Sequence, residues 1–161
     1  MEILWQELIA GFADRKELLQ SVVRLIAAVL LGAVIGFERE KAGKAAGLRT
    51  HMLVTLGTCV FVLASAHSGM NSDGLSRVIQ GIVTGIGFIG AGSILKLNDE
   101  RDIRGLTTSA GIWLAAAIGV TVGLGAIGLA LLSTLVTVIV LAAVKPLDFM
   151  LDENGKKENG P

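Results

Sequence analysis

Two short segments of the sequence combine an arginine with hydroxyl residues of the kind that commonly begin a helix. The first is Arg49-Thr50, and the second contains Arg104, Thr107 and Thr108. The start of a helix presents backbone N–H groups without partners and the positive end of the helix dipole. Arginine adds a fork of donors that matches oxyanions. This combination is suited to binding a phosphate, a lipid headgroup or an acidic segment of a partner.

Glu38 and Arg39 end the apolar segment that precedes these two runs. Two interpretations of Glu38 stay open. In the first, Glu38 is the internal counter-ion of Arg49 or Arg104 and the hydroxyls only cap helices. In the second, the helix starts and arginines form a binding site, which an ion pair could gate. The candidate ligand or partner site comprises Glu38, Arg39, Arg49, Thr50, Arg104, Thr107 and Thr108.

The sequence lacks the residue patterns of catalysis and of metal binding. No Asp or Glu lies near the middle of an apolar segment, whereas magnesium and calcium sites need several oxygen ligands. His51 and His67 are expected on opposite sides of the membrane and so form no metal pair. No phosphate-binding glycine loop, nucleophile elbow or zinc spacing is present. We therefore expect no catalytic residues, no metal and no cofactor, and a self-contained cation pump is disfavoured.

The composition is that of a protein embedded in a lipid bilayer. Of the 161 residues, 52% are apolar and 17% are charged, and the mean hydropathy is +0.69. The apolar content and the mean hydropathy are higher, and the charged fraction is lower, than in a soluble domain of this size. The formal net charge is zero, so nothing in the charge balance points to nucleic acid.

The apolar segments predict an all-α, polytopic transmembrane bundle of about five spans. Residues 105–144 carry no charge and would be about 60 Å long as one helix, twice the hydrocarbon thickness, so we divide them at Gly123-Leu124-Gly125. Arg24 lies one turn inside the first span and is expected to anchor in the headgroups. Thr50 is the expected N-cap of the second span. The expected units are an interfacial amphipathic helix at 1–20, spans at 21–37, 52–66, 78–95, 106–122 and 126–144, and a polar tail at 145–161.

Glycine is concentrated in the span at 78–95, which we expect at the centre of the bundle. Bare helix flanks let neighbouring helices approach closely in lipid. Gly119 and Gly123 form a further notch, and the sequence leaves open whether such notches serve contacts within one chain or between copies. The glycines expected to pack are Gly32, Gly36, Gly81, Gly85, Gly87, Gly90 and Gly92.

The basic residues of the connections predict the orientation. Residues 38–51 contain four Lys or Arg, residues 96–104 contain three and the tail from Lys145 contains three, while the alternate connections contain one and none. Basic connections stay on the cytoplasmic side. We therefore expect the N-terminus outside and the C-terminus in the cytoplasm.

Several of these segments together resemble the MgtC/SapB family of bacterial membrane proteins. The matching stretches are Arg24 with LLGAVIGFERE, the run 46–50, the glycine helix 85–92, and the run 104–108 followed by Trp113. The resemblance implies an inner-membrane bundle linked to magnesium starvation, intracellular survival and virulence. Such proteins have often been labelled magnesium transport proteins. A regulatory role is the better description, and inhibition of the membrane ATP synthase has been proposed for some members.

Longer relatives in that family carry a soluble C-terminal domain, whereas 17 residues follow Val144 here. A function that rests on that domain is therefore not expected of this chain. We predict a non-enzymatic membrane protein that supports adaptation to low magnesium or intracellular stress by binding and regulating another membrane component. The alternative is a transporter or channel for magnesium or an anion.

Overall fold

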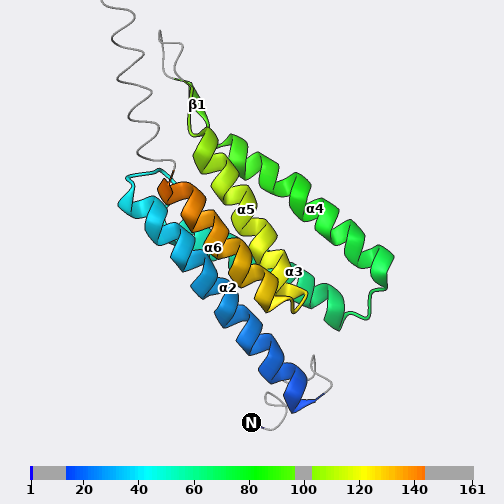
Figure 1. Cartoon of the computed structure of the whole chain (residues 1–161). Coiled ribbons are helices and arrows are strands. Elements are labelled where there is room, and N and C mark those ends of the chain that lie inside the picture. Colours follow the sequence, from blue (N-terminus) through cyan, green and yellow to red (C-terminus); the bar gives the residue numbers. More distant parts are fainter. Residues whose placement is uncertain (2–13, 97–102, 144–161) are drawn as a thin grey trace, which may run out of the picture.

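The computed structural model describes residues 1, 14–96 and 103–143, and in this part of the chain it is an all-α bundle, as expected (Figure 1). Five helices are joined by short connections, one of which includes a two-stranded hairpin. The elements are α2 (Arg15–Lys41), α3 (Leu48–His67), α4 (Ser72–Ala91), β1 (Leu95–Lys96), β2 (Ile103–Arg104), α5 (Leu106–Gly123) and α6 (Ile127–Ala143). Most of the expected interfacial helix at 1–20 and the whole tail at 145–161 lie outside the described residues, and residues 15–20 belong to α2.

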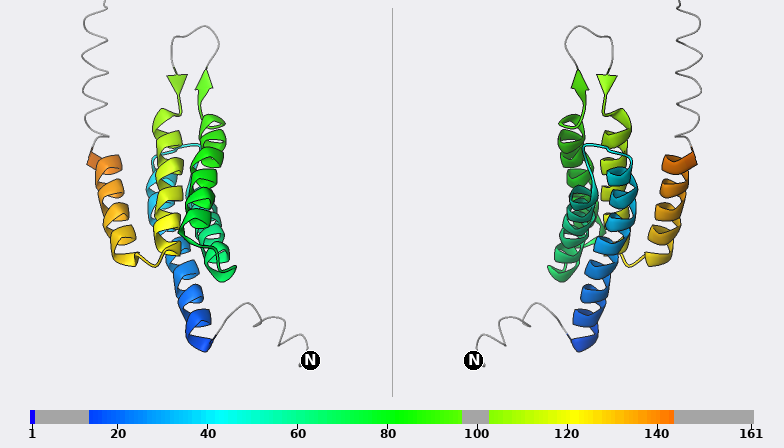
Figure 2. Two further views of the ribbon diagram at one scale, coloured as in Figure 1. Left: turned by 90° about the vertical axis from the view of Figure 1, so that its right-hand side faces the viewer. Right: turned by 90° about the vertical axis from the view of Figure 1, so that its left-hand side faces the viewer.

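The helices run alternately up and down the bundle (Figure 2). As a result, the ends of α2, α4 and α6 and the starts of α3 and α5 lie at the same end, where β1 pairs with β2. We call this the hairpin end. The basic connection between α2 and α3 and the strands that contain Lys96 and Arg104 therefore lie at one end of the molecule (Figure 2).

In the described part of the chain, four helices are long and apolar enough to cross a membrane, namely α2, α3, α4 and α5. The fifth, α6, is apolar and shorter, with 17 residues. The chain is thus a multi-pass membrane protein. Helix α4 begins earlier than expected because the Asn71 side chain accepts a hydrogen bond from the Gly74 N–H at 2.9 Å and caps it at Ser72.

The helix at the centre is α5, which corrects the expectation that the glycine-rich helix, now α4, is central. In the apolar 18-residue stretch of each helix that is suited to cross the membrane, 56% of the residues are buried in α5 and 11% in α4. Helix α5 contacts the other four helices, and α4 and α6 lie on opposite sides of it (Figure 2). The physical reason is that α5 is apolar on every side, which is typical of a buried helix, whereas a bare glycine face packs only where a neighbour meets it.

Two glycines of α2 and two of α5 bring these helices close to α3. A Cβ added to Gly36 would lie 2.7 Å from the Leu48 Cα, and one added to Gly123 would lie 2.7 Å from the Val62 Cβ. Gly32 and Gly119 meet the backbone and side chains of the middle of α3 in the same way. These notches serve contacts within one chain.

The glycines of α4 behave differently from one another. A Cβ added to Gly90 would lie 2.6 Å from the Ser109 Oγ of α5, so this glycine packs as expected. A Cβ at Gly81, Gly85 or Gly87 would meet nothing within 4 Å, and one at Gly92 would meet only carbonyls of its own helix. One edge of the glycine helix is therefore packed and the rest is open.

Candidate functional site

The last turn of α2 holds a buried arginine with unused donors. Arg39 is 3% exposed, and its Nη1 lies 3.7 Å from the Oε2 of Glu38. The Nε and Nη2 of Arg39 and the Oε2 of Glu38 are buried and accept or donate no hydrogen bond within the described structure. A buried charge without hydrogen bonds is costly, so such an arrangement calls for a functional explanation.

His51 belongs to the same region and was not among the predicted site residues. Its side chain is completely buried, and its Nδ1 lies 2.9 Å from the Gly47 carbonyl oxygen. Its Nε2 faces Gly111 of α5 and is buried without a partner in the described residues. Glu38 and Arg39 lie within electrostatic range of the ring. We call Glu38, Arg39 and His51 the polar cluster.

The sequence analysis considered His51 only to exclude a metal pair with His67. A signal was available, because an ionisable residue in the first turn of an apolar helix rarely lacks a polar role. The sequence alone offered no comparable signal for the ion-pair partner of Glu38. The structure places Glu38 beside its neighbour Arg39 and not beside Arg49 or Arg104, the two counter-ions that the sequence suggested.

The start of α3 is capped from the preceding helix. The Leu48 N–H donates to the Glu40 Oε2 at 2.8 Å, and Gly47 occupies the N-cap position without a side-chain cap of its own. A Cβ on Gly47 would lie 2.7 Å from that same oxygen, so glycine makes room for the carboxylate. Thr50, the expected N-cap, lies instead inside the first turn.

The remaining predicted site residues lie at the hairpin end but on separate surfaces. Arg49 and Thr50 line a groove between α3 and α4, whereas Thr107 lines a pocket between α5 and α6. Thr108 is buried, with 4% of its surface exposed, and Arg104 is exposed on β2. The structure thus brings the predicted residues to one end of the bundle without joining them into a single cavity.

Several hydroxyl groups within the spans donate to carbonyls of their own helices. Thr55 donates to the His51 carbonyl at 3.0 Å, and Thr58 donates to the Val54 carbonyl at 3.0 Å. Thr84 likewise donates to the Gln80 carbonyl at 2.9 Å. Among the described residues, no group of three or more His, Cys, Asp or Glu is placed to hold a metal ion.

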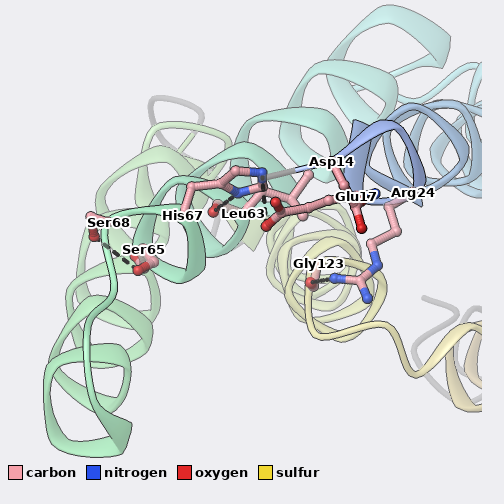
Figure 3. A network of polar contacts seen from close by, with 8 residues as sticks. All are labelled: Asp14, Glu17, Arg24, Leu63, Ser65, His67, Ser68 and Gly123. Carbon is pink, nitrogen blue, oxygen red and sulfur yellow. Dashed lines mark hydrogen bonds and ion pairs between the residues drawn. The ribbon is translucent and has the colours of Figure 1, made fainter. Parts of the chain in front are cut away.

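A second set of polar contacts lies at the opposite end of the bundle (Figure 3). The Arg24 Nη1 donates to the Gly123 carbonyl at 3.0 Å, and the His67 Nε2 lies 3.6 Å from the Glu17 Oε1. A cation at the end of a helix satisfies free carbonyls and favours the helix dipole. Arg24, which the sequence suggested as a headgroup anchor, therefore caps the C-terminus of α5.

The chain has clear relatives. Residues 25–150 match the sequence profile described as the MgtC family. The putative magnesium transporter YhiD of Escherichia coli is 42% identical over 137 residues, covering 81% of this chain and 63% of that protein. Protein SrpB of Synechococcus elongatus is 40% identical over 135 residues, covering 77% and 74%. Protein MgtC of Salmonella typhimurium is 43% identical over 123 residues, covering 76% and 52%.

The chain spans 63% of the length of YhiD and 52% of the length of the Salmonella protein. In both cases the matched part is most of the present chain. No solved structure matches it.

Proposed function

Because the chain belongs to the MgtC family, we propose that it is a non-enzymatic membrane protein that supports adaptation to low magnesium or related stress by binding and regulating another membrane component. The link to magnesium rests on the family and on the name of its relative YhiD. The mode of action rests on the polar cluster.

The observation that carries the proposal is that one edge of the buried Arg39 guanidinium has no hydrogen-bond acceptor within the described residues. Its Nη1 faces Glu38, while Nε and Nη2 have no acceptor within the described residues. Nε–H and Nη2–H point in parallel along one edge of the group, which is the geometry that binds a carboxylate or phosphate with two hydrogen bonds. We propose that an acidic group of the partner occupies this edge.

Access to that edge is controlled by the chain itself. The Lys44 N–H donates to the Arg39 carbonyl at 3.0 Å, which holds the connection 42–47 close to the end of α2. The two Arg39 donors are buried, so a neighbouring segment must shift before the partner's acid can reach them, and we propose that this segment is the connection 42–47. The Glu38–Arg39 pair would then gate the site.

The test is the substitution Arg39→Lys, which keeps the charge and removes the two parallel donors. We expect it to abolish growth at low magnesium in a bacterial strain that depends on this chain, while the amount of protein in the membrane stays at the wild-type level. Arg104→Ala is expected to weaken growth in the same way, because the proposed contact surface extends over the hairpin end. Lys41→Gln, an exposed change in the same turn of α2, is the matched control.

Two results would overturn the proposal. If Arg39→Lys and Glu38→Gln protein disappears from the membrane in proportion to the loss of growth, the polar cluster only maintains the fold. If both variants support wild-type growth, the cluster has no part in the function.

The alternative function is a transporter or channel for magnesium or an anion, and the name of the relative YhiD, a putative magnesium transporter, favours it. Purified protein in liposomes separates the two. Flux of magnesium or chloride above that of empty vesicles supports transport, and no flux under several gradients supports the binding protein. The pairing of Thr55, Thr58 and Thr84 within their own helices favours the second outcome.

The proposed orientation places the hairpin end in the cytoplasm. Single cysteines at Lys44 and Ser72 would lie at opposite ends of the bundle, with the buried Cys59 replaced by alanine. A membrane-impermeant thiol reagent applied to whole cells is expected to label position 72 alone. Labelling of position 44 alone would reverse the orientation.

A further inference from the structure

An open groove separates α3 from α4. It has a volume of about 810 Å³, within the range of roughly 300–1,000 Å³ that holds small ligands in other proteins. Gly57 of α3 and Gly81 and Gly85 of α4 line it, and a Cβ at any of the three would meet nothing within 4 Å. Helix α4 is held mainly by α5 and only in part by α3, so part of its side toward α3 is left open as this groove. From this groove we infer a site for an anionic phospholipid.

Among the described residues that line the groove, one is charged, and it lies at one end. Arg49 and Thr50 line the groove at the hairpin end, and Arg49 is exposed. No carboxylate in residues 14–96 or 103–143 forms an ion pair with Arg49. Both residues lie in the first turn of α3, where backbone N–H groups have no acceptor within the helix. Guanidinium, hydroxyl and N–H donors together are suited to a phosphate.

The rest of the lining is apolar. Apart from Arg49 and the threonines, the groove is formed by apolar residues such as Leu53, Val54 and Phe61 of α3 and Ile82 and Ile89 of α4, together with the three glycines. The Thr58 hydroxyl, which also lines it, already donates to the Val54 carbonyl. A ligand with one anionic group and one long apolar chain has the same distribution of polarity as this groove.

The length of the groove distinguishes a lipid from a transmembrane helix of a partner. The lining runs from Arg49 to Phe61 on α3 and from Ile89 back to Val78 on α4, which is about 17 Å at 1.5 Å per residue. One leaflet of the hydrocarbon core is about 15 Å thick, and a spanning helix needs about twice that length. The groove therefore fits the acyl chain of one leaflet, with Arg49 at the depth of that leaflet's phosphates.

The charge of Arg49 selects the class of lipid. Basic pockets between spans bind anionic headgroups at the membrane surface. A zwitterionic headgroup carries its own cation beside the phosphate, which weakens the attraction to an unpaired arginine. The site therefore prefers phosphatidylglycerol over phosphatidylcholine. This preference does not depend on the proposed partner of the polar cluster, since it is a property of the purified chain in lipid.

Native mass spectrometry of the purified full chain tests this, with equal amounts of phosphatidylglycerol and phosphatidylcholine added to the detergent. We expect one retained lipid per chain, with phosphatidylglycerol in excess. Arg49→Gln should lower that excess about fivefold, as expected for one exposed charge-assisted contact. Lys44→Gln removes an exposed cation near the same end that does not line the groove, and it should leave the excess unchanged.

A second pair of variants tests the path of the acyl chain. Gly85→Leu fills the groove, whereas Gly87→Leu places the same side chain two residues away at a glycine that does not line it. Both positions have open space around the new Cβ, so both variants should fold. We expect Gly85→Leu alone to abolish retention of both lipids.

Three outcomes would overturn the inference. Equal retention of the two lipids by the wild-type chain would remove the role of Arg49. Equal behaviour of Gly85→Leu and Gly87→Leu would remove the groove as the binding site. A wild-type dimer that Gly85→Leu converts to monomer would show that a second copy of the chain occupies the groove.

Discussion

Replacing Gly119 with alanine tests the packing of α5 against α3. A Cβ at this position would lie 2.9 Å from the Thr55 carbonyl carbon and would also meet the Thr55 oxygen and the Thr58 hydroxyl. Carbon atoms in contact lie about 3.5–4.0 Å apart, so the two helices would have to separate by nearly 1 Å. Two of the three obstructing atoms are backbone and cannot rotate away.

The magnitude follows from two opposing effects. Overpacking a well-packed interface costs about 1–3 kcal/mol, and contact with backbone places this case at the upper end. Alanine recovers about 1 kcal/mol through its greater helix propensity. We expect a net loss of about 2 kcal/mol, which corresponds to a melting temperature lower by about 5 °C for a chain of this size.

The measurement is thermal unfolding of the purified protein in detergent, followed by circular dichroism. Gly87→Ala is the matched control, because a Cβ there meets nothing within 4 Å and the same gain in helix propensity applies. We expect this control to melt at or slightly above the wild-type temperature. Equal melting temperatures for Gly119→Ala and Gly87→Ala would show that α5 is not pressed against α3.

Three further changes test contacts that hold the ends of helices. Arg24→Met should lower the free energy of unfolding by about 1 kcal/mol, because the Gly123 carbonyl at the end of α5 loses a charged donor; detergent unfolding measures this, and no change would mean that water replaces the guanidinium. Glu40→Ala should lower the free energy of unfolding by about 1 kcal/mol, because the Leu48 N–H loses its acceptor. Glu40→Gln keeps an acceptor and should keep most of the stability. Equal melting temperatures of the two variants would contradict this cap. Gly105→Ala should cost about 1–3 kcal/mol, because the φ of +100° disfavours any side chain, and a wild-type melting temperature would show that the turn before α5 relaxes freely.

The sequence by itself determined the class of protein and the approximate extent of its helices. Apolar content over about twenty residues decides whether a helix suits the bilayer, and this is a property of each segment alone. The break at 123–125 could be placed for the same reason, since an uncharged run of forty residues is too long for one span. The sequence placed Arg49 and Arg104 at one end of the bundle because successive helices alternate in direction. In the structure α3, whose first turn contains Arg49, begins at the end where β2, which contains Arg104, pairs with β1 (Figure 2).

Only the tertiary structure decided which helix is central and which polar groups meet. Gly81 and Gly119 are alike in sequence terms, yet one faces open space and the other faces the Thr55 backbone. Likewise, Arg24 reaches a carbonyl 99 residues away. Helix formation depends on the residues of one segment, whereas close packing and burial depend on two surfaces at once. The residues of one segment therefore predict that it forms a helix, but they do not predict which neighbouring helix it packs against.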